Sequence, residues 1–120
     1  MLNDEDINKL CSGRIILAKF LSSNGRDSAG DHYAIMLEDN ETIKENDEYY
    51  VVLISHNTTI DPHHLVPVPS RLGYTGNIVC SWVTLLPLPG IKKVCNGVLM
   101  PVELKKVTDM INIHRKNTKK

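Results

Sequence analysis

Short apolar runs, separated by glycine, proline and small polar residues, are the feature that most constrains the fold of this chain. They lie at residues 14–20, 33–37, 49–54, 65–69, 78–85 and 91–94. Bounded in this way, such runs predict strands. The run at 49–54 is continuously apolar, which is typical of a strand buried on both faces at the centre of a sheet. Pro67 and Pro69 predict an edge position for their run, because proline cannot donate to the ladder.

Helical patterns are confined to the two ends of the chain. Residues 102–113 repeat apolar side chains at spacings of three and four, and Pro101 suits the first position of that helix. A short helical turn is expected within residues 1–12, capped by Asn3 or Asp4. We therefore predict a mainly β fold, a small barrel or sandwich with one C-terminal α-helix packed across it. Closure into a barrel is favoured because it removes exposed sheet edges.

The length of 120 residues predicts one domain, with residues 1–12 as an N-terminal extension and residues 114–120 as a basic, solvated tail. The three cysteines are odd in number and widely spaced, which favours free thiols in a reducing compartment, the cytoplasm. No apolar run is long enough to span a membrane, and the acidic start does not resemble a signal peptide. The zero net charge does not by itself argue for nucleic acid.

Two further features bear on the function. Residues 22–31 contain two glycines, small polar residues and no large apolar residue, which predicts a loop of the kind that often carries function. Trp82 is expected in the core, because a chain with one Trp and one Phe needs its large side chains for packing.

Taken in order, these segments resemble the PemK/MazF toxin family of type II toxin–antitoxin systems. The matching segments are residues 13–18, 25–31, 33–37, 50–55, 77–84, 97–99 and 103–111. The resemblance implies an SH3-like barrel of the PemK type that forms a homodimer, binds an antitoxin protein and cuts single-stranded RNA. In one departure, His32-Tyr33 stands where the family usually has an Arg-Pro pair whose arginine serves catalysis.

RNA cleavage by attack of the 2′-hydroxyl needs a base, an acid and cationic donors, and no metal or cofactor is expected. His32 suits the base or the acid, because imidazole titrates near neutral pH. Arg26, in the polar loop, suits the phosphate contact of the missing arginine. Ser55 matches the serine or threonine that the family has at the end of its third strand. Substrate-binding roles are expected for four further residues: Thr58, Arg71, Tyr74 and Thr84.

Two functions stay open at this point. The first is a ribonuclease toxin, which the ordered resemblance favours. The second is a non-catalytic barrel that binds a protein or a nucleic acid, which the missing Arg-Pro pair and the neutral charge favour. A third, a metalloenzyme built on His63 and His64, is disfavoured because adjacent histidines in a strand diverge and no third ligand has a suitable spacing.

Overall fold

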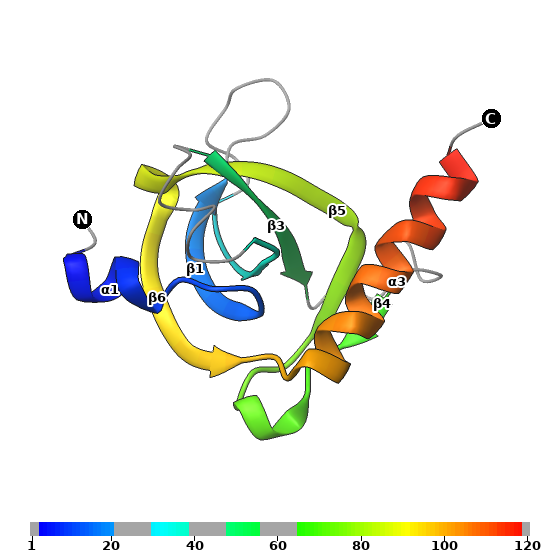
Figure 1. Cartoon of the computed structure of the whole chain (residues 1–120), viewed down its shortest axis with the longest axis horizontal. Helices are drawn as coiled ribbons and strands as arrows, with labels where there is room; N and C mark the ends of the chain where they lie inside the picture. Colours follow the sequence, from blue (N-terminus) through cyan, green and yellow to red (C-terminus); the bar gives the residue numbers. More distant parts are fainter. Residues whose placement is uncertain (1–2, 21–29, 39–47, 56–64, 119–120) are drawn as a thin grey trace.

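The computed structural model describes residues 3–20, 30–38, 48–55 and 65–118, and its strands form one six-stranded antiparallel sheet. The strand order is β4-β5-β3-β2-β1-β6. The sheet curls around its own centre, with α3 outside it beside β4 and β5, and α1 beside β6 (Figure 1). In chain order the elements are α1 (Asp4–Lys9), β1 (Arg14–Phe20), β2 (Gly30–Met36), β3 (Glu48–Ser55), β4 (Leu65–Pro67), the 3₁₀ turn η2 (Ser70–Leu72), β5 (Asn77–Pro87), the 3₁₀ turn η3 (Leu88–Gly90), β6 (Ile91–Val98) and α3 (Pro101–Thr118).

Both faces of the central strands are buried. One face carries what we call the α1-side cluster: Leu10, Ile16, Ala18, Ala34, Met36, Tyr49, Val51, Leu86 and Ile91, with Leu53 and Val94 packed against it. The other face meets α3 and carries the α3-side cluster, whose buried members are Ile15, Ile35, Val52, Ile54, Val68, Ile78, Cys80, Cys95, Leu99, Val107 and Ile111. Successive side chains of a strand point to opposite faces. The mainly β fold with one long C-terminal helix is confirmed, and so is the central position of β3.

Several element boundaries differ from the prediction. β1 begins and ends as predicted, and β4 lies at a sheet edge as its proline requires. β2 begins at Gly30, so His32 belongs to a strand and not to the preceding loop. β6 continues to Val98, beyond the predicted end at residue 94, because its pairing with β1 extends as far as Arg14.

The two ends of the chain also pack more fully than predicted. α1 is capped by Asn3, whose side chain accepts the Asp6 N–H at 2.8 Å, and the next turn buries Leu10 in the α1-side cluster. α3 runs to Thr118, well past the predicted end at residue 113 and through most of the expected basic tail. No helix within the described ranges is both long and apolar enough to cross a membrane.

The expectation that Trp82 lies in the core was wrong, because β5 changes direction in its middle. The pairing of β5 with β3 steps from Val52↔Val83 to Leu53↔Val79, which inserts three extra residues, 80–82, into β5. Figure 1 shows the resulting bend. A bulge of this kind breaks the alternation of faces. Val83 therefore packs against the α3-side cluster, and Trp82 is 38% exposed.

Gly13 joins the start of β1 to two other parts of the sheet. Its N–H donates to the Met36 carbonyl at 2.8 Å, and its carbonyl accepts the Leu99 N–H at 2.9 Å. Its φ of 90° lies in the left-handed region that favours glycine. A Cβ at this position would lie 3.0 Å from the Leu99 carbonyl oxygen. Both the backbone conformation and the close approach therefore require glycine.

We expect Gly13→Ala to lower the free energy of unfolding by at least about 2 kcal/mol, from left-handed strain plus the contact with Leu99. Gly73→Ala is the matched control, because Gly73 has a φ of 79° and no atom within 4 Å of its added Cβ. The control should lose only about 1 kcal/mol, the cost of the strained φ alone. Urea denaturation measures both values. Equal losses in the two variants would show that the approach to Leu99 has no energetic consequence.

A polar contact fastens η2 to the start of α3. The Glu103 carboxylate accepts the Met100 N–H at 2.7 Å and forms an ion pair with Arg71 of η2. Arg71 also donates to the Val98 carbonyl at 3.3 Å. The Met100 N–H and the Arg71 guanidinium both favour the charged carboxylate, so they lower the pKa of Glu103.

This lowered pKa predicts an acid-sensitive contribution to stability. Since the folded pKa of Glu103 lies below the unfolded one, the contribution is complete above the unfolded pKa and is lost as pH falls through the folded pKa. Glu103→Gln removes it. We therefore expect the wild type to lose more stability than Glu103→Gln between about pH 6 and about pH 3, a range that brackets the ordinary carboxyl pKa. Thermal melts across that range measure the difference, and parallel curves would contradict the prediction.

Candidate functional site

The two candidate catalytic residues that the structure describes come from neighbouring strands. His32 lies in β2 and Ser55 ends β3. The described ladder between these strands stops at the pair Ala34 and Leu53. His32 and Ser55 each lie two residues beyond that last pair. Because residues two apart share a face, His32 and Ser55 lie on the face of the α1-side cluster, and both side chains are half-buried.

The remaining catalytic prediction concerns the polar loop. β1 ends at Phe20 and β2 begins at Gly30, so His32 lies close to where the chain leaves the segment that contains Arg26. Arg26 itself, Thr58, His63 and His64 lie outside the described residues. Their suggested roles therefore stay predictions.

Thr84 lies on the same face of the sheet as His32 and Ser55. It pairs with Val51 of β3, a member of the α1-side cluster, and directly paired residues share a face. Thr84 also lines a pocket of about 520 Å³, between the end of β1, the end of β5 and η3. Lys19 and Lys92 line the same pocket. Lys19 follows Ala18, which pairs with His32, so alternation directs the Lys19 side chain away from the face that carries His32.

Tyr74 lies on the opposite face. It packs against the α3-side cluster, and its ring meets the ring of Tyr33 edge-on, with centroids 4.9 Å apart and planes at 61°. A hydrogen bond with Cys95, reinforced by burial, raises the pKa of Tyr74 to about 12. The phenol therefore stays protonated at neutral pH. Tyr33 follows His32 in the chain, but alternation directs the two side chains to opposite faces.

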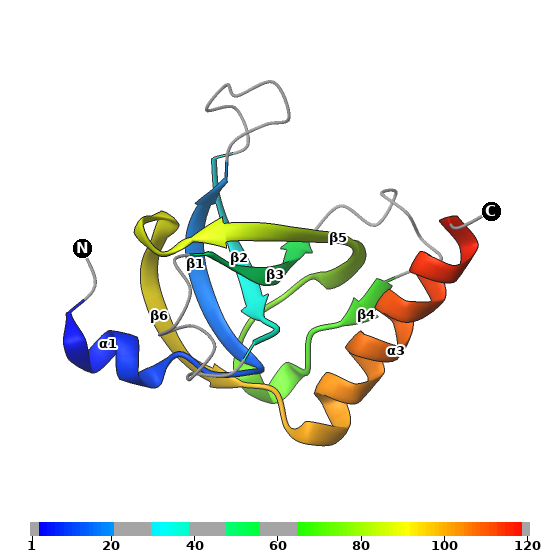
Figure 2. The same ribbon diagram turned by 45° about the horizontal axis from the view of Figure 1, so that its top comes forward.

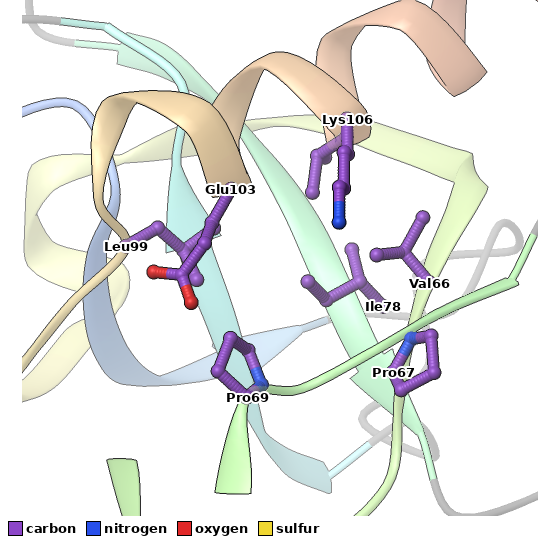
Figure 3. A pocket seen from close by; sticks show the side chains of 8 residues that line it. Val66, Pro67, Pro69, Ile78, Leu99, Glu103 and Lys106 are labelled. Atoms are coloured by element: carbon purple, nitrogen blue, oxygen red, sulfur yellow. The ribbon is translucent and has the colours of Figure 1, made fainter. Parts of the chain in front are cut away.

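Arg71 also lies away from His32, beside a second pocket of about 260 Å³ between β4 and α3. Figure 3 shows Val66, Ile78 and Leu99 in the apolar part of this pocket, with the Glu103 carboxylate and the Lys106 amine at its edge. The Arg71 guanidinium is engaged with Glu103. A phosphate group would have to displace that carboxylate to bind Arg71.

The structure thus divides the predicted site residues into two groups. His32, Ser55 and Thr84 share one face, whereas Arg71 and Tyr74 belong to the other. Three residues that line a pocket with Thr84 or contact Tyr74 were not predicted from the sequence: Lys19, Lys92 and Tyr33. Lys19 is the one charged residue within the apolar run 15–20, which is a weak signal for it. Lys92 carries no comparable signal, because only the long-range pairing of β6 with β1 brings it close to Lys19.

Comparisons with known proteins identify the fold of this chain through solved structures and not through sequence. No family model matches this sequence, and no curated protein sequence is detectably similar to it. Solved structures, however, match closely in shape.

MazF from Deinococcus radiodurans matches with a TM-score of 0.76 and 14% identity, over 89% of this chain and 96% of that one. A MazE–MazF complex from the same organism matches with a TM-score of 0.72, 14% identity and the same coverage. An endoribonuclease in complex with its cognate antitoxin, from a mycobacterial species, matches with a TM-score of 0.72 and 11% identity, over 89% of this chain and 95% of that one. At such identities the likeness concerns the fold alone. The chain has the fold of the MazF toxins.

Proposed function

We propose that this chain is a MazF-like toxin that cuts single-stranded RNA without a metal ion and is bound by an antitoxin protein. The observation that carries the proposal is the common face of His32 and Ser55 on two adjacent strands, which follows from the pairing of His32 with Ala18 and from the position of Ser55 two residues after Leu53. The MazF-like fold supports it, because the solved neighbours include an endoribonuclease and toxin–antitoxin complexes. Fold alone does not set activity, so the residues of the site have to carry the chemistry.

The proposed reaction is an internal transfer of the phosphodiester. The 2′-oxygen of one nucleotide attacks the adjacent phosphorus, the bond from phosphorus to the 5′-oxygen of the next nucleotide breaks, and a 2′,3′-cyclic phosphate forms. A base removes the 2′-hydroxyl proton, and an acid protonates the departing 5′-oxygen. His32 supplies one of these roles. Ser55 donates a hydrogen bond to a phosphate oxygen, and Arg26 supplies positive charge at the same group.

The substitution of histidine for arginine changes how such a site responds to pH. An arginine is always charged, whereas imidazole exchanges its proton near neutrality. We therefore expect His32→Ala to reduce RNA cleavage at least about 100-fold, the scale of one lost acid–base group. Ser55→Ala should reduce it about 10-fold, the scale of one lost hydrogen bond.

The measurement is a gel assay on a long single-stranded RNA, with an all-deoxy strand as the uncleavable reference. His114→Ala, a histidine change on α3, is the matched control and should cleave as the wild type does. Equal cleavage by His32→Ala and the wild type would overturn the proposed role of His32. RNA that is bound but left intact by the wild type at every pH would favour the second candidate, a non-catalytic binding barrel, to which the His32-Tyr33 substitution points.

A homodimer is part of the same proposal. Tyr50 of β3 and Leu85 of β5 are direct cross-strand partners, and their side chains are 46% and 45% exposed. Tyr50 lies beside α3, where it lines a small pocket together with Ile111. Adjacent exposed large apolar side chains mark surfaces that other proteins cover. We propose that a second copy of the chain covers them, because members of the PemK/MazF family, which the chain resembles, form dimers.

Replacing both residues, Tyr50→Ser with Leu85→Ser, is expected to convert the dimer to a monomer or to weaken it at least about 100-fold, as removal of central apolar contacts does. Analytical ultracentrifugation measures the mass. The control, Val102→Ser with Ile113→Ser, changes two exposed apolar residues of α3. Its measured mass in solution should equal that of the wild type. A monomeric wild type, or a dimer that only the control disrupts, would refute this assignment.

A further inference from the structure

We infer that Asn77, the first residue of β5, recognises an RNA base next to the phosphate that is cut. The inference rests on the proposed function, because it assigns the base selectivity of the same site. Asn77 is the direct cross-strand partner of Ser55, the last residue of β3. The side chains of such partners lie on one face of the sheet, with their Cβ atoms about 5 Å apart.

The position of Asn77 in β5 independently places its side chain on the face that carries His32. The next residue, Ile78, belongs to the α3-side cluster and lines the pocket between β4 and α3. Since side chains alternate along a strand, Asn77 points away from that cluster. The extra residues of β5 come only after Val79, so they do not disturb the alternation here. Asn77 therefore borders the Ser55 side of the proposed site.

The backbone of Asn77 is held on both sides. It pairs with Ser55 of β3 and with Pro67 of β4. The preceding residue, Gly76, has a φ of 113°, and its carbonyl accepts the Val68 N–H at 3.2 Å. A binding group carried by paired strands is positioned more accurately than one on a loop. The carboxamide of Asn77 therefore has the fixed placement that discrimination between bases requires.

The chemistry of this side chain suits a base better than a phosphate. The carboxamide is half-buried and forms no hydrogen bond with the residues that the structure describes. It offers one acceptor and two donors, whereas a phosphate oxygen only accepts. The edges of RNA bases present donors and acceptors side by side, and an amide pairs with both at once.

The proposed dimer does not use this end of β3. Tyr50 precedes Ser55 by five residues, which is about 17 Å along an extended strand. Tyr50 also lies beside α3, on the opposite face, and its partner Leu85 shares that face. RNA contacts at Ser55 and Asn77 and subunit contacts at Tyr50 and Leu85 therefore occupy different ends and different faces of the same two strands.

The test compares binding to three short RNA strands that differ only in their base: oligoadenylate, oligocytidylate and oligouridylate. Each carries 2′-O-methyl groups, which block attack by the 2′-oxygen, and fluorescence anisotropy measures its Kd. For the wild type we expect the largest and smallest Kd to differ at least about fivefold, the lower end of what one bidentate base contact gives. Asn77→Ala should bring the three Kd values within about twofold of one another.

Two further variants distinguish a base contact from a structural role, and they carry the test if Asn77→Ala does not fold. Asn77→Gln retains the amide and should preserve the wild-type order of the three strands. Asn77→Asp keeps the shape but only accepts hydrogen bonds, and its charge repels all three strands alike. It should weaken binding to oligouridylate the most, because adenine and cytosine carry an exocyclic amino donor and uracil does not.

The matched control is Asn96→Asp, which introduces the same charge at an exposed asparagine of the edge strand β6. Its three Kd values should keep the wild-type order and ratio. Equal strand preferences in the Asn77 variants and the control would overturn the inference, and so would a wild type that binds the three strands equally or not at all. A uniform loss of affinity in Asn77→Ala, with the preference unchanged, would also overturn it, because it would place Asn77 on the phosphate backbone.

The same measurements separate this inference from the proposed cleavage. A wild type that cuts RNA while its preference ignores Asn77 would refute the inference and leave the proposed function intact. A preference that depends on Asn77, in a protein that leaves cleavable RNA whole, would support the inference and refute the proposed catalysis.

Discussion

The position of β1 between β2 and β6 is the constraint on which the rest of the structure depends. Its pairing with β2 is local in sequence, whereas its pairing with β6 closes a contact across most of the chain. Arg14 secures this closure, because its guanidinium donates to the carbonyls of Lys9, Cys95 and Asn96. The carbonyl of Gly13, directly before it, accepts the N–H of Leu99, the residue that follows β6. β1 therefore fixes the relative positions of the start of α3, the end of α1 and the part of β2 that contains His32.

Burial on both faces of the sheet has a direct consequence for function. The side chain of a residue near the end of a central strand points toward either the α1-side or the α3-side cluster. Because side chains alternate along a strand, the next residue points toward the other cluster. His32 and Tyr33 are separated in this way. Arg71 is held on the α3 side by Glu103, where it supports the helix start. Figure 2 shows that α3 and β4 lie together on one side of the curled strands, away from β6 and α1.

The chemistry proposed for the site also follows from its position at the ends of strands. The ladder between β2 and β3 stops before His32 and Ser55, so neither residue lies within the described pairing of those strands. Their side chains are half-buried, so part of each is exposed to solvent. In this setting a histidine in place of an arginine exchanges a fixed charge for a group that transfers protons.

The local chemistry of the sequence determined the elements themselves. The apolar run of β1, the continuous burial of β3, the edge position forced by Pro67 and the helix that begins at Pro101 all follow from patterns a few residues long. The tertiary structure decided the rest. Trp82 is exposed because three extra residues in β5 shift the alternation, and β6 is long because Arg14 and its strand pair with it. The grouping of His32 with Ser55, and of Lys19 with Lys92, depends on which strands become neighbours and in which register. That information is held in long-range pairing, to which residues far apart in the chain contribute jointly, so no local pattern contains it.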